Sequence, residues 1–413
     1  MNTSLSRRSF LKSAGALGVV GISSGLFPAW MPRRAFAQSA AHVRGAVLVA
    51  IFLRGGMDGL SVVAPYGDGR HYYDARPTLA IAEPGAGNGA LDLDGYFGLH
   101  PAMAPLINVY QAGQLAVVQA AGLTNSTRSH FDAMQYMEYG TPESKTTGTG
   151  WIGRHLETTA SANDSPFRAV GMGAMVQDSL RGTVSPLSLR SIADLHLRGR
   201  EGELRQAQEA LARLYRTTST GEALGAQAGM VFSTVDMLQQ ISALGYTPAN
   251  GAVYPEDEEG FGRALRQIAQ LIKADVGLEV ACVDLGGWDT HENQGTHGGY
   301  FQSHLEVLAQ GLGAFHADLQ DWMAGITVVT MSEFGRRVSE NASAGTDHGH
   351  GNFMLVMGGE VNGGRVYADW PTLAPEALNE GDLAITTDYR DVLAEVLTDR
   401  KSTRLNSSHL GIS

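Results

Sequence analysis

Five short apolar runs, rich in β-branched residues, indicate the fold class of this chain. They lie at residues 46–53, 115–120, 278–285, 326–331 and 353–357. Apolar runs of this length, without polar alternation, are typical of strands buried on both faces of a parallel sheet. Helical patterns separate them at residues 101–112, 130–139, 260–274 and 300–322. This alternation predicts an α/β fold with a doubly wound, mostly parallel sheet.

The sequence between residues 161 and 255 has a different character from its surroundings. It contains an irregular stretch at 185–197, a polar helical pattern at 201–215 and a possible helix at 236–244. We interpret residues 161–255 as a mostly helical insertion in a single α/β domain that spans residues 43–400.

The N-terminal residues 1–37 have the pattern of an export signal. An arginine pair, Arg7 and Arg8, is followed by Ser-Phe-Leu-Lys, an apolar stretch at 14–27 and the small-residue pattern Ala-Phe-Ala at 35–37. This order predicts a twin-arginine signal, with the twin-arginine export machinery as a partner and a periplasmic or secreted mature protein. The alternatives are an ordinary secretory signal and an uncleaved anchor. Because the apolar stretch is short and broken by glycine, we expect no stable membrane span in the mature chain.

The last residues, 401–413, have a polar sequence without amphipathic period, KSTRLNSSHLGIS. We interpret this segment as a foreign or artefactual tail that follows the native domain. The alternative is a disordered native tail.

Charge and cysteine content exclude several classes of function. The formal charge is −12, which argues against nucleic acid as a partner because phosphate binding needs a basic surface. The single cysteine excludes an intramolecular disulfide, a cysteine-rich zinc site and an iron–sulfur cluster. No glycine-rich phosphate-binding motif follows a predicted strand, so a nucleotide cofactor is not indicated.

Acidic and histidine residues gather where the predicted strands end. In open α/β sheets, ligands bind beyond the carboxyl ends of the strands. Carboxylate oxygens and imidazole nitrogens at these positions suit zinc, manganese or iron better than magnesium or calcium. The alternative is that these residues form turns and make only local hydrogen bonds. The candidate metal ligands are Asp58, Asp289, His291, Asp347, His348 and His350.

The loop after the second predicted strand offers hydroxyl groups ahead of a helix. Thr124, Thr127 and Ser129 are candidate nucleophiles, and Arg128 is a candidate binding group for a phosphate or sulfate. Thr127 or Ser129 could instead be a simple helix N-cap. After the fourth predicted strand, Glu333 and Arg336 have either a direct role or a purely structural one as ion-pairing groups.

Five motifs carry a resemblance to a known family. The chain resembles the exported bacterial family called domain of unknown function 1501 over residues 7–397. That family is similar to the alkaline phosphatase and sulfatase superfamily, so the resemblance implies an alkaline-phosphatase-like core with one or two divalent metal ions. The motifs are FLRGGMDGL at 52–60, TRSHFDA at 127–133, GWDTH at 287–291, MSEFGRR at 331–337 and GTDHGHGN at 345–352.

The resemblance also implies roles for individual residues. Asp58 resembles the first-strand metal ligand, and Asp347 with His348 resembles the Asp-His-Gly ligand pair. Asp289 with His291 resembles the other Asp/His pair, although one residue separates them here and three separate them in the phosphatases. His350 resembles a late histidine ligand. The nucleophile is expected within residues 124–129, where no counterpart of the sulfatase cysteine is present.

These observations lead to one main hypothesis and two alternatives. The main hypothesis is a metal-dependent hydrolase of phosphate or sulfate esters, with a small anionic ester as substrate. Its cofactors would be one or two ions of zinc, manganese, iron or calcium. The first alternative is a non-catalytic exported binding or assembly protein on the same fold. The second is a metal-dependent oxidoreductase.

Overall fold

A computed structural model describes residues 46–159, 163, 165–192 and 245–399, together with positions 234, 237, 238 and 241. The predicted export signal at 1–37 and the predicted foreign tail at 401–413 lie outside the described residues. So does the greater part of the predicted insertion.

The described residues are built around a nine-stranded mixed sheet. Its order is β11-β5-β10-β9-β1-β8-β6-β7, and β12 pairs with β5. Central strand β1 runs parallel to β8 and β9, whereas β10 runs antiparallel to both of its neighbours. All five predicted strands are present. The strands are β1 (Val47–Leu53), β5 (Leu115–Gly122), β6 (Ala169–Met172), β7 (Leu187–Leu189), β8 (Val280–Leu285), β9 (Ile326–Met331), β10 (Asn352–Gly358), β11 (Arg365–Tyr367) and β12 (Thr387–Asp388).

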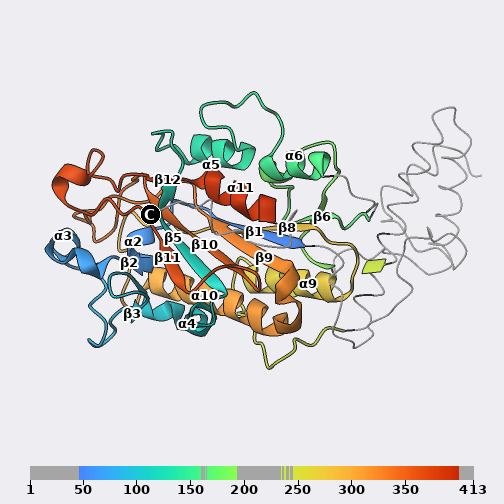
Figure 1. Cartoon of the computed structure of the whole chain (residues 1–413), viewed down its shortest axis with the longest axis horizontal. Coiled ribbons are helices and arrows are strands. Elements are labelled where there is room, and N and C mark those ends of the chain that lie inside the picture. Colours follow the sequence, from blue (N-terminus) through green and yellow to red (C-terminus); the bar gives the residue numbers. More distant parts are fainter. Residues whose placement is uncertain are drawn as a thin grey trace, which may run out of the picture.

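Helices cover both faces of this sheet (Figure 1). On one face lie α5 (His130–Tyr139), α6 (Trp151–Thr158) and α11 (Tyr389–Asp399). On the other lie α4 (Ala104–Gln111), α9 (Phe261–Lys273) and α10 (Tyr300–Asp318). The fully buried strand β1 contributes alternate residues to two separate hydrophobic cores, one under each helical layer. A strand with both faces covered needs a continuous apolar sequence, which explains why β1 was predictable.

Residues 165–192, within the segment predicted as a mostly helical insertion, include strands of the main sheet. This segment contributes strands β6 and β7 to the main sheet, both parallel to β8, with a single turn of 3-10 helix, η3 (Asp178–Leu180), between them. Both strands are short, four and three residues, so their apolar signal is weak in the sequence.

Smaller elements decorate the main sheet near β1. They include α2 (Gly59–Val62), α3 (Arg70–Tyr73) and a three-stranded sheet of β2 (Val63–Ala64), β3 (Leu91–Asp92) and β4 (Gly98–Leu99). Short 3-10 turns are η1 (Tyr66–Asp68), η2 (Pro101–Met103), η5 (Gln320–Gly325) and η6 (Pro375–Ala377). In the part of the chain that the structure describes, no helix is long and apolar enough to span a membrane.

Sheet topology brings five polar segments to one edge. The carboxyl ends of β1, β8 and β9 lie together because these strands are parallel. Strand β5 also ends at this edge, because two antiparallel pairings, through β10, separate it from β9. Strand β10 begins there for the same reason. The loops that follow β1, β5, β8 and β9, and the loop that precedes β10, therefore meet at one edge of the sheet.

Candidate metal centre

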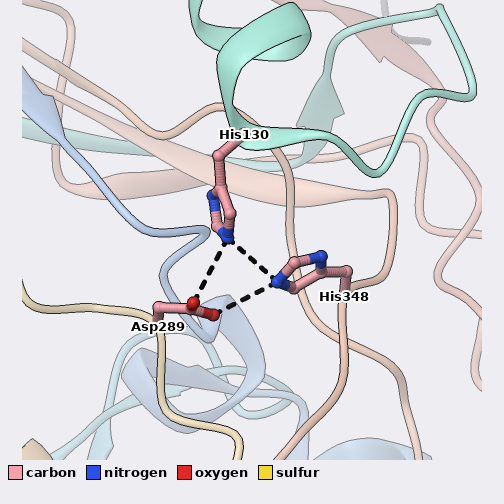
Figure 2. A group of neighbouring side chains, drawn as sticks. All are labelled: His130, Asp289 and His348. Atoms are coloured by element: carbon pink, nitrogen blue, oxygen red, sulfur yellow. Dashed lines mark hydrogen bonds and ion pairs between the residues drawn. The ribbon is translucent and has the colours of Figure 1, made fainter.

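Three side chains from three of these loops form a compact cluster at the carboxyl edge (Figure 2). His130 is the first residue of α5, Asp289 follows β8, and His348 precedes β10. Their candidate ligand atoms all lie within 4.8 Å of one another. Nε2 of His348 lies 2.9 Å from Nε2 of His130 and 3.1 Å from Oδ1 of Asp289. Nε2 of His130 lies 3.5 Å from Oδ2 of Asp289.

A third imidazole, that of His291, joins the cluster from the other side of His348. Its Nε2 lies 2.9 Å from Nε2 of His348 and 3.1 Å from Oδ1 of Asp289. Nε2 of His348 therefore lies between the Nε2 atoms of His130 and His291, next to the carboxylate of Asp289. Separations near 3 Å are those expected between neighbouring ligands of one metal ion whose bonds are about 2.1 Å long.

The partners of the three Nδ1 atoms fix the tautomer of each ring. Nδ1 of His130 lies 2.7 Å from Oε1 of Glu333, and Nδ1 of His291 lies 3.0 Å from Oδ1 of Asp347. Nδ1 of His348 lies 2.9 Å from the backbone carbonyl oxygen of Arg128. Ionised carboxylates and backbone carbonyls only accept hydrogen bonds, so each Nδ1 must donate its proton.

This assignment has a direct consequence for the centre of the cluster. A neutral imidazole whose Nδ1 carries the proton presents a bare lone pair at Nε2. The Nε2 lone pair of His348 then faces those of His130 and His291, each at 2.9 Å, with an anionic carboxylate beside them. Lone pairs cannot hydrogen-bond to each other, so the arrangement requires a positive charge between them. Either additional protons or a metal cation would supply it.

A buried guanidinium holds the carboxylate in place. Arg336 is 1% exposed, and its Nη2 donates to Oδ1 of Asp289 at 2.7 Å. Further bonds from Arg336 reach the backbone carbonyls of Gly55, Gly56, Trp288 and Thr346. Burial alone would raise the pKa of Asp289, but Arg336 outweighs this effect and lowers that pKa to about 2. Asp289 is therefore a carboxylate at any physiological pH.

The surroundings shift the pKa values of His130 and His348 in opposite directions. The hydrogen bond to Glu333 raises the pKa of His130. Burial lowers the pKa of His348. With neutral imidazoles, three carboxylates (Asp289, Glu333 and Asp347) and one guanidinium leave two net negative charges at the cluster, which one divalent cation would neutralise.

The cluster is open to solvent on one side. The side chain of Asp289 is 47% exposed, and that of His291 is 40% exposed. Structural metal sites are usually closed by protein ligands, whereas catalytic sites keep a position open for water or substrate. The exposure of these side chains is therefore that of an open site, not a closed one.

Asp58, which the sequence predicted as a metal ligand, is not part of this cluster in the described residues. Asp58 and Arg76 are both completely buried, and they form an ion pair with Nη1 to Oδ2 at 2.6 Å. Ser61 and Gln294 donate further hydrogen bonds to the same carboxylate. Nη2 of Arg76 donates to the other oxygen, Oδ1, at 2.9 Å, so both oxygens of Asp58 already accept hydrogen bonds from buried side chains.

His350 and Asp347 also lie outside the group of mutually close ligand atoms. Nε2 of His350 lies 3.1 Å from the backbone carbonyl oxygen of Leu123, so this histidine connects the loop after β5 to the loop before β10. Asp347 accepts from His291 and from the amide of Asn341. Asp347 thus contacts the cluster through His291, and His350 contacts the loop after β5. The metal-ligand role of both residues stays a prediction.

The hydroxyl loop shows mainly local contacts. Oγ1 of Thr127 accepts the backbone N–H of Ser129, and Ser129 is the N-cap of α5. Local hydrogen bonding and helix capping of this kind were the alternative to a nucleophilic role for these hydroxyl groups. Thr124 is exposed on the same loop. Nη2 of Arg128 lies 2.5 Å from Oδ2 of Asp382, which ties the predicted anion-binding group to a buried carboxylate.

Sequence reasoning did not propose His130 as a ligand, and it left open whether Glu333 has a direct or a structural role. His130 stands in the same strand-end loop as the proposed nucleophiles, and its place after a buried strand was the available signal. Its contact with His348 depends on residues 218 positions apart. Only the sheet order places these two loops side by side.

The fold and this cluster define an α/β protein with a histidine-rich candidate metal centre at the carboxyl edge of its sheet. A family model described as "Protein of unknown function (DUF1501)" matches residues 46–403, so the chain belongs to this family. This confirms the resemblance found in the sequence motifs. No significant match is found among curated proteins.

Two solved structures show a distant likeness. The lipoteichoic acid synthase LtaP from Listeria monocytogenes is 12% identical with a TM-score of 0.35, and the match covers 83% of this chain and 74% of that chain. Ps i-CgsB in complex with k-i-k-neocarrahexaose is 12% identical with a TM-score of 0.33, covering 82% of this chain and 75% of that chain. Similarity at this level does not establish a shared chemistry.

Proposed function

We propose that His130, His291, His348 and Asp289 bind one divalent transition-metal ion, and that the protein is a metal-dependent hydrolase of phosphate or sulfate esters. The position of His348, whose Nε2 lies 2.9 Å from Nε2 of His130 and of His291 and 3.1 Å from Oδ1 of Asp289, carries this proposal. Three imidazoles and a carboxylate suit zinc, manganese or iron better than calcium, which prefers oxygen ligands. The charge count favours one dication over two.

The surroundings of the cluster support catalysis rather than a structural role. Asp347, which orients His291, has a side chain that is 55% exposed, so the centre is accessible to a substrate. A divalent ion at such a centre acidifies water and neutralises charge on an ester oxygen. The buried guanidinium of Arg336 would hold Asp289 ionised and fixed in orientation throughout the reaction.

We propose water, rather than a side-chain hydroxyl, as the nucleophile. Oγ1 of Thr127 already accepts the backbone N–H of Ser129, and Oγ of Ser129 accepts that of Asp132 in α5. The side chain of Arg128 is 39% exposed and pairs with Asp382, so it can contact the anionic part of a substrate only from the rim of the site.

The remaining parts of the proposal concern fold and location. We propose that the core is alkaline-phosphatase-like and that the twin-arginine machinery exports the protein to the periplasm or beyond. The strand-end positions of Asp289 and His348 support the first part, and the N-terminal sequence motif supports the second.

Metal content of the purified mature chain, beginning at Gln38, tests the proposal. Inductively coupled plasma mass spectrometry should find close to one equivalent of a transition metal, or titration should load it. Asp289→Asn and His348→Gln should lose the metal, whereas Asp58→Asn should keep it. A chain that neither contains nor takes up metal would overturn the assignment.

A panel of nitrophenyl phosphate monoesters, phosphate diesters and sulfate esters then tests the activity of the loaded protein. Hydrolysis that disappears in Asp289→Asn is the expected result. Metal binding without hydrolysis of any ester would favour the alternative of a non-catalytic binding or assembly protein, to which the position of Asp58 outside the cluster also points.

A further inference from the structure

We propose that Glu333 is a positioning residue that fixes the orientation and strengthens the metal affinity of His130. This inference rests on the proposed metal centre and assigns a role to a residue outside the ligand set. Glu333 is completely buried at the end of β9. One of its oxygens, Oε1, accepts both the Nδ1–H of His130 at 2.7 Å and the backbone N–H of Gly55 at 2.8 Å.

The backbone around Gly55 explains how an amide reaches this carboxylate. Gly55 has φ of +119°, a conformation that residues with side chains rarely adopt. A Cβ atom at this position would lie 2.7 Å from the backbone nitrogen of Asp289 and 2.9 Å from that of Trp288. Only glycine allows this close approach of the two strand-end loops. Gly55 of the first motif therefore allows its backbone N–H to anchor Glu333.

The neighbours of Glu333 immobilise it further. Oγ of Ser332 accepts the N–H of Met57 at 2.9 Å and donates to the carbonyl of Leu53 at 2.6 Å. These bonds tie residues 332–333 to the loop after β1. The ring of Phe334 packs against the imidazole of His130, with centroids 4.8 Å apart. His130 is therefore held by a hydrogen bond at Nδ1 and by an aromatic contact on its ring.

This arrangement matches the way proteins orient metal-binding imidazoles. A carboxylate that accepts Nδ1–H selects the tautomer with a bare Nε2 and increases the basicity of that nitrogen. Loss of such a partner typically lowers metal affinity 10–100-fold. Glutamine at position 333 would keep an accepting oxygen of nearly the same shape but remove the negative charge. Glu333→Gln therefore tests the charge with little change in packing.

The experiment measures the affinity of the mature chain for Zn²⁺ and Co²⁺ by competition with a chelator. Glu333→Gln should raise the dissociation constant about 10–100-fold and shift the d–d absorption of bound Co²⁺. An unchanged affinity and an unchanged spectrum, in a variant that melts like the wild type, would overturn the role of Glu333. That result would leave the metal centre itself intact, whereas failure of the wild type to bind either ion would overturn the proposed function.

A matched control and a double variant distinguish an effect of Glu333 on the position of His130 from a general loss of protein stability. Glu340 also accepts backbone N–H groups, from Thr78 and Leu79, but outside the cluster. Glu340→Gln should leave metal affinity unchanged. If Glu333 acts through His130, then Glu333→Gln should have no further effect on affinity in a His130→Ala background. An equal loss in both backgrounds would contradict action through His130.

A second measurement keeps the proposal testable if Glu333→Gln fails to fold. The ring nitrogens of His130 in the metal-free wild type can be assigned by two-dimensional ¹⁵N NMR of the imidazoles. A proton on Nδ1 that exchanges slowly with water is the expected result. A neutral ring protonated at Nε2 would overturn the proposal, because Glu333 would then not receive the Nδ1 proton.

Discussion

Replacing Asp58 by asparagine separates a structural role from a metal-binding role. Asp58 and Arg76 are both 0% exposed, and two hydrogen bonds of 2.6 and 2.9 Å join them. Removing one charge of a buried pair leaves the other without compensation, which costs about 3–5 kcal/mol. The amide of asparagine would also place a donor against the donors of Ser61 or Gln294. We therefore expect Asp58→Asn to lower the free energy of unfolding by about 3–5 kcal/mol.

The stabilisation that Asp58 provides should also depend on pH, in a direction that follows from its pKa. Burial alone would raise the pKa of Asp58, but the charge of Arg76 outweighs it and holds that pKa below its usual value. A carboxyl with a depressed folded-state pKa stabilises the protein above its unfolded pKa, about 3.9. The stabilisation is lost as the pH falls through the folded-state value. The difference in the free energy of unfolding between wild type and Asp58→Asn should therefore be largest near pH 7 and become smaller in acid.

The assay is urea unfolding at pH 7, followed by tryptophan fluorescence, together with metal analysis. Asp178→Asn is the control, because its partner Arg181 is three residues away and 55% exposed. Such surface pairs contribute about 0–1 kcal/mol. Asp58→Asn should be strongly destabilised yet bind metal normally once folded. A variant of unchanged stability that has lost its metal would refute this reasoning and restore Asp58 as a ligand.

Three further predictions concern the centre and the core. Asp289→Asn should weaken metal binding at least 100-fold in chelator competition while the metal-free protein keeps its melting temperature within a few degrees. Gly55→Ala should destabilise the protein by more than about 2 kcal/mol in urea unfolding, because of strain at positive φ and the close backbone contact. Asp318→Asn should cost about 2–4 kcal/mol in the same assay, because the buried carboxylate accepts bonds from Lys273, Tyr246 and Tyr254. Unchanged values in any of the three would contradict the corresponding contact.

Local sequence patterns were sufficient for the main elements of the fold. Strand β1 is buried on both faces, so its seven residues are all apolar and the strand was recognisable. Helix α5 was predicted with its observed bounds, and in the structure Ser129 is its N-cap and Gly140 ends it in the left-handed region. Strands β6 and β7 were missed because they are short and owe their existence to pairing with β8.

The candidate site was only partly predictable for a similar reason. Asp289, His291 and His348 were expected to converge, and the structure brings them together. Asp58 carries the same local signal, an acidic residue after a buried strand, yet it pairs with Arg76. That arginine lies 18 residues further along the chain, and no local pattern marks it as a buried partner.

The sequence by itself determined which segments form buried strands, where polar residues follow them and which chemical groups are available at those points. These properties depend on neighbouring residues and on hydrophobic periodicity, so they can be read locally. Only the tertiary structure decided which of the strand-end groups meet. That choice depends on strand order, on the antiparallel direction of β10 and on competition among buried partners, all of which involve residues far apart in the chain. His130 belongs to the cluster because it contacts His348, and Asp58 lies outside it because it pairs with Arg76.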